Sequence, residues 1–464
     1  MESRPVILVE FNELCPSLID RWMSSGDLPN FKRFHDASSV WVTEADELND
    51  PYLQPWIQWY SLHSGKPFKE HGVLRLSEGC NRELSSIWDI LLEHGMNVMN
   101  FSSMNCRRFE AGGSVFLPDP WNDAERAFPA EMDVFRRFLV KSVQEQAHAS
   151  WRMSEGLELL SFLSSHGLRL QTVWAAVRQV AGEKLLRKPT RWQRVKIMDL
   201  IMLDVFEHYY QKHRPQFATF FSNSTAHLQH AYWRYLEPEK FSEPMTPAER
   251  QHYGDAILQG YVAMDRLLGR LMALAGKAGA SLMFATALSQ QPYLAFEGRG
   301  GRHYYRPLNV QALLESLGIV PVDIQPIMAH QYILAFEDRE RRLQAEESLS
   351  KIFVGDRRLF DWVEGETPNR LVVGSQVYSP LKEGQTFEIR TASGTRTESF
   401  FTHFYELEAT KSGRHHPDGY FWAQVGRHRR EERKVSILDV APTILRHFGI
   451  DAERMSGTSL PLAA

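Results

Sequence analysis

The chain has 464 residues, with 53 Lys and Arg against 57 Asp and Glu, and a formal net charge of −4 at pH 7. A hydrophobic fraction of 43% and a charged fraction of 24% are ordinary for a globular protein and exclude a disordered, collagen-like or coiled-coil chain. The near-neutral charge balance excludes the large basic surface typical of nucleic-acid binding, so we expect no nucleic-acid partner.

Strands and helices alternate along most of the chain. Residues 6–11 are largely apolar and β-branched, which predicts a buried parallel strand, and a polar loop and a helix over 17–23 follow. Similar patterns predict, in chain order, a helix at 88–94, strands at 97–101 and 217–221, a helix at 248–275, a strand at 281–286 and a helix within 436–448. This alternation is typical of an α/β fold with a mostly parallel sheet flanked by helices. Active sites in such folds lie at the carboxyl ends of the strands.

Two regions interrupt the alternation. Residues 130–213 are helical by pattern and contain no good strand, whereas residues 320–405 combine a strand-like run, a charged helix and short β-like stretches. We therefore expect one sheet domain over residues 1–464, interrupted by a mainly helical insertion at 130–213 and a smaller α+β insertion at 320–405.

Cysteine content and hydropathy bear on the compartment. Cys15, Cys80 and Cys106 are too few, and odd in number, for a disulfide framework, which favours a reducing environment. No stretch approaches the ~20 apolar residues of a transmembrane helix, and the apolar run at residues 5–9 is too short for a signal sequence. We expect a cytoplasmic protein without a transmembrane segment.

Five segments carry short motifs in a particular order. They are Val6–Pro16 with Gly26-Asp-Leu-Pro-Asn30, Trp59–Gly65 with His71-Gly72, His230 with Trp233, Tyr261 to Gly269, and His415–Gly419 with Asp439–Leu445. In this order they resemble the type I phosphodiesterase/nucleotide pyrophosphatase family of the alkaline phosphatase superfamily. The resemblance implies an alkaline-phosphatase-like fold, two divalent metal sites and a Thr or Ser nucleophile. Two such ions would stabilise the attacking and leaving oxygens of an in-line displacement.

Most of the functional positions implied by the resemblance are altered in this sequence. The Asp of the first loop becomes Asn12, the nucleophile becomes Pro55, and the Ser-Asp-His at a strand end becomes residues 286–288, Thr-Ala-Leu. Two histidines of one metal site are kept as His230 and His415, with His416 as an alternative to the latter. We therefore expect at most one bound metal, zinc or manganese, held by His230 and His415, or catalysis without any metal.

Other polar residues follow the predicted strands and form the rest of the candidate site. Glu10 is expected in a cleft, because burying an unpaired carboxylate is costly, and histidines at strand ends can act as acids and bases. The candidate catalytic residues are Glu10, Asn12, Glu13 and His227, and the candidate substrate-binding residues are Asn223, Thr225, Arg299, Arg302 and His303.

Two functions remain open on these grounds. One is a divergent enzyme of phosphoester-hydrolase ancestry that hydrolyses or transfers a group of a phosphorylated, nucleotide-linked or sulfated substrate, either a small molecule or glycan-linked. The other is a catalytically inactive pseudoenzyme that serves as a binding or scaffold protein. The sequence predicts no oligomeric state.

Overall fold

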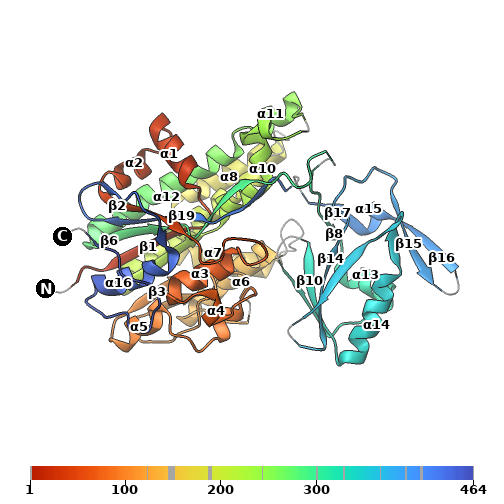
Figure 1. Ribbon diagram of the computed structural model, residues 1–464, viewed down its shortest axis with the longest axis horizontal. Helices are drawn as coiled ribbons and strands as arrows, with labels where there is room; N and C mark the ends of the chain where they lie inside the picture. Colours follow the sequence, from red (N-terminus) through yellow and green to blue (C-terminus); the bar gives the residue numbers. More distant parts are fainter. Residues whose placement is uncertain are drawn as a thin grey trace. The chain divides into compact units, whose positions relative to one another are not determined.

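The computed structural model describes residues 3–122, 124–144, 152–185, 191–242, 244–298, 301–327, 330–365, 367–391, 394–407 and 411–462 (Figure 1). The chain divides into two compact units. Unit 1 comprises residues 1–230, 255–291 and 414–464, and unit 2 comprises residues 231–254 and 292–413.

Unit 1 is built on a nine-stranded sheet with the order β20-β2-β19-β6-β1-β5-β3-β4, and β21 also pairs with β2. The strands are β1 (Val6–Phe11), β2 (Ser38–Glu44), β3 (Val98–Phe101), β4 (Val115–Leu117), β5 (Phe217–Ser222), β6 (Ser281–Ala285), β19 (Asp418–Gln424), β20 (Arg429–Arg430) and β21 (Val435–Ser436). Only β19 is antiparallel to its neighbours, β2 and β6. The predicted α/β fold with a mostly parallel sheet is confirmed.

Helices cover both faces of this sheet, which is why every residue of β1 is buried. Figure 1 shows α1, α2 and α12 on one side and α3, α5 and α16 on the other. The helices of unit 1 are α1 (Pro16–Ser25), α2 (Pro29–His35), α3 (Pro55–Ser64), α4 (Phe68–His71), α5 (Ile87–Glu93), α6 (Asp133–Gln144), α7 (Met153–Ser165), α8 (Leu170–Leu185), α9 (Arg194–His213), α12 (Ala256–Ala278) and α16 (Val440–His447). α10 (Ser224–Leu236) begins in unit 1.

The region 130–213, expected to be a helical insertion, carries α6, α7, α8 and α9 within unit 1. The single helix predicted at 248–275 is instead two helices, α11 (Pro247–Tyr253) in unit 2 and α12 in unit 1. The break falls at Gly254 and Asp255. Both residue types have low helix propensity, and Asp255 occupies the N-cap of α12, a position that favours Asp.

Unit 2 contains two four-stranded antiparallel sheets and includes the region 320–405. One sheet joins β9 (Asp323–Pro326), β10 (Gln331–Ala335), β13 (Phe360–Glu364) and β14 (Arg370–Ser375), and the other joins β11 (Ile352–Val354), β12 (Arg357–Arg358), β15 (Thr386–Thr391) and β16 (Gly394–Ser399). The remaining elements are β8 (Tyr305–Pro307), paired with β17 (Phe404–Glu406), and α13 (Val310–Ser316), α14 (Arg339–Ser350) and α15 (Phe400–His403). Buried side chains such as Leu334, Leu349, Leu359 and Phe400 form its own hydrophobic core.

Two further short strands, β7 (Ser289–Pro292) and β18 (Gly413–His416), pair with each other. β7 follows the end of β6 and β18 precedes the start of β19, so Gln290 and His415 lie near the ends of two neighbouring strands of the main sheet.

Candidate functional site

Three ionisable side chains from distant parts of the sequence meet in unit 1. Glu13 follows β1, His230 lies on α10 and His415 lies on β18. Oε2 of Glu13 is 3.1 Å from Nε2 of His230 and 3.6 Å from Nε2 of His415. One potential ligand atom from each residue lies within 4.8 Å of the other two. The two histidines predicted to share a metal site are thus brought together, and a carboxylate joins them.

The backbone turn after β1 directs Glu13 into this cluster. Glu13 has a φ of +62°, a left-handed conformation that is unfavourable for a residue with a side chain and needs support from its surroundings. Its N–H donates to the carbonyl of Thr286 at 3.3 Å. Its carboxylate accepts hydrogen bonds from Asn12 Nδ2 at 2.8 Å and Gln290 Nε2 at 2.5 Å. These contacts hold the carboxylate in one orientation.

The carboxylate of Glu13 is only 2% exposed but remains charged. Burial is the largest influence on its pKa and would raise it, yet the charges of His415 and His230 and the hydrogen bonds from His230 and Gln290 together outweigh burial. The net effect lowers the pKa of Glu13 from its usual 4.5 to about 2. Glu13 therefore presents a fixed negative charge at neutral pH.

A buried hydrogen-bond chain supports the backbone of Glu13. Gln229 Nε2 donates to the Glu13 carbonyl at 2.8 Å, and Tyr261 Oη donates to Gln229 Oε1 at 2.7 Å. The Cys15 N–H in turn donates to Tyr261 Oη at 2.7 Å. The sequence did not identify Gln229 or Gln290 as residues of the site. Of the residues in this hydrogen-bond chain, only Tyr261 belongs to one of the motifs noted in the sequence.

Asn12 positions Glu13 rather than facing solvent. Its Oδ1 accepts from Trp59 Nε1 at 2.7 Å, and its Nδ2 donates to Glu13 at 2.8 Å and to Asn223 Oδ1 at 2.6 Å. The side chain is 1% exposed in total, and both amide hydrogens are engaged. These contacts tie the Asn12 amide to Glu13, and the catalytic role expected for Asn12 stays a prediction.

Glu10 lies in the core and not in the expected cleft. It is fully buried, and its Oε1 lies 2.7 Å from Nε2 of His63 while Oε2 accepts from Ser103 Oγ at 2.6 Å. The expectation assumed that Glu10 had no partner, but the fold supplies His63, which is itself 3% exposed. A paired carboxylate can be buried at much lower cost than an isolated one.

The three candidates near the start of α10 differ in exposure. Thr225 is 1% exposed, and its hydroxyl has no hydrogen-bond partner among the described residues. It packs closely against Gly260 of α12, where the absence of a side chain leaves room for it. Asn223 and His227 are exposed, and His227 lies one helical turn before His230.

The remaining substrate-binding candidates belong to unit 2. The Arg302 guanidinium lies 4.6–5.8 Å from the centres of four aromatic rings, those of Tyr293, Phe296, Tyr304 and Tyr378. Nδ1 of His303 is within hydrogen-bonding distance of the carboxylate of Glu406. Arg299 lies outside the described residues. His416, the alternative to His415, accepts a hydrogen bond from the N–H of Asp418 at 3.1 Å and is not part of the Glu13 cluster.

The positions implied for the second metal and the nucleophile carry no suitable groups. Pro55 is buried in the first turn of α3. Thr286 is fully buried and accepts a hydrogen bond from the N–H of Tyr420, while Ala287 and Leu288 belong to the hydrophobic core. These residues do not fit a metal ion, so a two-metal route through these positions has no chemical basis here.

A nearby hydroxyl does not replace the missing nucleophile. Ser61 Oγ lies 2.9 Å from Nε2 of His71, and both side chains are buried. Burial, aided by the charge of Arg82, lowers the pKa of His71 to about 4, so its ring is neutral at pH 7. Since its Nδ1 accepts from the N–H of Val73, Nε2 carries the proton and donates to Ser61. His71 therefore cannot act as a base toward that hydroxyl.

Comparisons with known proteins find similarity among solved structures alone. No family model matches the chain, and no curated protein is similar to it. Phosphonoacetate hydrolase from Sinorhizobium meliloti 1021, in complex with phosphonoacetate, is 12% identical, with 97% of this chain and 96% of that chain covered and a TM-score of 0.43. Murine ectonucleotide pyrophosphatase/phosphodiesterase 5 is 10% identical, with 98% of each chain covered and a TM-score of 0.39.

Among the described residues, none of the helices combines the length and the apolar character needed to cross a lipid bilayer.

Proposed function

We propose that this protein is a divergent enzyme of phosphoester-hydrolase ancestry whose site holds one divalent cation through Glu13, His230 and His415. The observation that carries the proposal is the meeting of these three side chains, which come from the turn after β1, from α10 and from β18. A buried carboxylate beside two imidazole nitrogens is a donor set that suits zinc or manganese.

The spacing of the donor atoms fits a single ion. A tetrahedral ion with ligand distances of about 2.0–2.1 Å separates its ligand atoms by about 3.4 Å. The distances from Glu13 Oε2 to the two histidine nitrogens, 3.1 and 3.6 Å, lie on either side of that value. The hydrogen bond from Gln290 to the carboxylate would orient the ligand, as partners of metal ligands commonly do.

The chemistry expected at this site is transfer of a phosphoryl or sulfuryl group of a small-molecule or glycan-linked ester to water or another acceptor. A bound divalent ion supplies Lewis acidity toward an oxygen of such a group. His227 is exposed one turn from His230, and we assign it the transfer of a proton to or from the substrate. Asn223 is exposed beside it and can donate to a substrate oxygen through its Nδ2.

A catalytically inactive binding protein is the second candidate, and one observation favours it. Pro55 and the apolar side chains of Ala287 and Leu288 stand where the resemblance implies a nucleophile and metal ligands.

The three cysteines are buried thiols, consistent with the cytoplasmic location that we retain as part of the proposal.

Metal analysis of protein purified without chelators tests the site. We expect about one equivalent of zinc or manganese, lost in Glu13→Gln and in His415→Ala. His416→Ala is the matched control and should keep the ion, because His416 is adjacent in sequence but bonds only locally in the described structure. Protein that contains no divalent metal and binds neither ion on titration would refute the metal site.

Turnover of aryl phosphodiesters, phosphomonoesters and sulfate esters separates the two candidates. Activity that falls in His227→Asn, with the metal retained, supports the enzyme and the proton-transfer role. Metal binding without turnover of any of these esters, in wild-type protein of full metal content, favours the inactive binding protein.

A further inference from the structure

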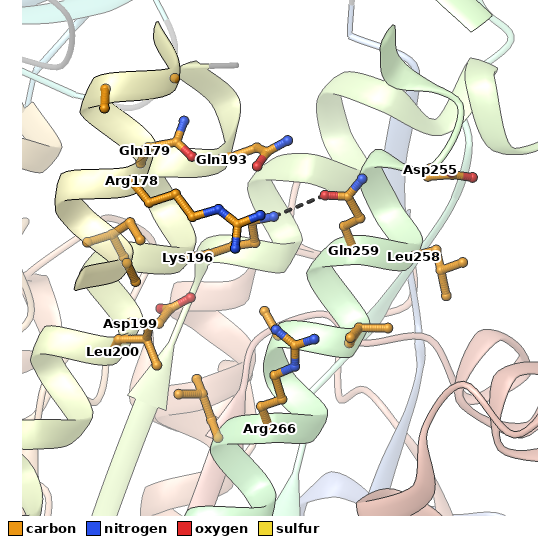
Figure 2. Close-up of a pocket in the computed structure, with 17 residues that line it drawn as sticks. Arg178, Gln179, Gln193, Lys196, Asp199, Leu200, Asp255, Leu258, Gln259 and Arg266 are labelled. Atoms are coloured by element: carbon orange, nitrogen blue, oxygen red, sulfur yellow. Dashed lines mark hydrogen bonds between the residues drawn. The ribbon is translucent and has the colours of Figure 1, made fainter. Parts of the chain in front are cut away.

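A cavity in unit 1 shares no residue with the Glu13 cluster. It has a volume of about 1010 Å³ and lies among α8, α9 and α12 (Figure 2). This volume is near the upper end of the ~300–1,000 Å³ range typical of small-molecule sites. The two regions of the chain that form it, the helical segment before β5 and the long helix before β6, contain none of the site residues expected from the sequence.

Three cationic side chains, one from each helix, line this cavity. They are Arg178 of α8, Lys196 of α9 and Arg266 of α12, and they point into the same space in Figure 2. None of the three pairs with a carboxylate within the described part of the chain, and Lys196 Nζ donates instead to Gln259 Oε1 at 3.1 Å. Burial, with the neighbouring charge of Arg266, lowers the pKa of Lys196 to about 8.

The two acidic residues that line the cavity, Asp199 and Asp255, form no ion pair with these cations in the described part of the chain. Both oxygens of Asp199 are occupied by hydroxyl donors, Ser222 at 2.8 Å and Ser224 at 2.5 Å. Asp255 is exposed at the N-cap of α12. The three cations are therefore available to an anion that enters the cavity.

Besides the charged residues and Gln179, Gln193 and Gln259, the lining is largely aliphatic. Helices α9 and α12 contribute most of this wall, through Ile197, Leu200, Leu258, Val262, Ala263 and Leu267. An inorganic anion alone would leave this surface uncovered, whereas an alkyl chain would bury it at a gain of about 25 cal/mol per Å².

The outer face of α8 continues this apolar character to the surface. Its exposed large apolar side chains are Leu170, Val173, Trp174, Val177 and Val180, with exposures of 78, 38, 72, 52 and 46%. Their helical spacing places them on one stripe, and Arg178 and Gln179 of the same helix line the cavity. A molecule with an apolar tail would therefore find apolar surface both inside the cavity and beside it.

We propose that this cavity is a binding site for an anionic amphiphile, whose phosphate, sulfate or carboxylate head group is held by Arg178, Lys196 and Arg266 while its alkyl tail lies along the aliphatic wall. Binding requires both the head group and the tail, since the cations and the aliphatic wall line the same cavity. Binding is non-covalent and independent of the function proposed for the Glu13 cluster.

Titration calorimetry with dodecyl phosphate, below its micelle concentration, tests the proposal on the full chain. We expect one site per chain and at least about tenfold weaker binding in Arg266→Gln, as for the loss of one charge-assisted hydrogen bond. Lys277→Gln is the matched control, because Lys277 is an exposed cation on the same helix outside the cavity. Thermal unfolding of each variant verifies that the fold is retained, and Lys196→Gln provides a second loss of charge.

Three further probes separate the contributions and the source of the ligand. Inorganic phosphate and dodecanol should each bind at least tenfold more weakly than dodecyl phosphate. Phosphatidylglycerol vesicles that bind wild-type protein but not Arg266→Gln would identify a membrane lipid as the ligand. Dodecyl phosphate binding without vesicle binding would identify a soluble amphiphile.

The proposal is overturned by any of three results. These are absence of dodecyl phosphate binding, equal binding of dodecanol or inorganic phosphate, or equal affinity in wild-type, Arg266→Gln and Lys196→Gln proteins.

Discussion

The stability of metal-free protein should depend on pH through Glu13. Its pKa is lowered from 4.5 to about 2 in the folded state, and at about 1.4 kcal/mol per pKa unit this amounts to about 3 kcal/mol of folding free energy. Because the folded-state pKa is the lower one, this stabilisation is present above about pH 4.5 and is lost as the pH falls toward 2. The linkage relation places about 1 kcal/mol of the loss between pH 5.5 and 3.5.

Urea unfolding of wild-type protein and Glu13→Gln, both in EDTA, measures this loss. The variant should be less stable at pH 5.5, and the difference in unfolding free energy should shrink by about 1 kcal/mol by pH 3.5. Other carboxylates titrate in both proteins and largely cancel in the difference. Parallel stability curves over this range would show that Glu13 is not the charged, histidine-paired group described above.

Three other substitutions test the framework of the site. His63→Ala should lower the unfolding free energy by about 3–5 kcal/mol in urea denaturation, since it leaves the Glu10 carboxylate buried without its partner; a loss below 1 kcal/mol would contradict the buried pair. Asn12→Asp should lower the unfolding free energy by about 1–3 kcal/mol, because it places a second carboxylate against Glu13. Metal analysis of this variant should still find no more than one ion, since Ala287 supplies no ligand. Tyr261→Phe should lower the unfolding free energy by about 1–2 kcal/mol and weaken zinc binding in a competition titration, because the hydroxyl bridges Cys15 and Gln229 behind Glu13. Unchanged zinc affinity would show that these hydrogen bonds do not position the carboxylate.

The fold class and the paired histidines followed from the sequence alone. The apolar run at β1 and the alternation of strands and helices are local patterns. A strand that is apolar along its whole length is buried on both faces, which is typical of a parallel sheet covered by helices. His230 and His415 were identified by motif order, and Pro55, Ala287 and Leu288 led to the prediction that a nucleophile and a second metal site are absent. These inferences need only the identity of each residue and its approximate register.

Which polar residues face a ligand was decided by tertiary structure. Glu10 and Glu13 are three residues apart and chemically alike, yet His63 and Ser103 draw the first into the core while the turn at Glu13 directs the second toward His230. These partners are far away in the sequence and could not be predicted from it, because a buried charge is stabilised by groups that only the folded chain brings within a few ångström. The cationic cavity of α8, α9 and α12 also depends on tertiary structure. Arg178, Lys196 and Arg266 are far apart in the sequence, and only the packing of the three helices places them around one cavity.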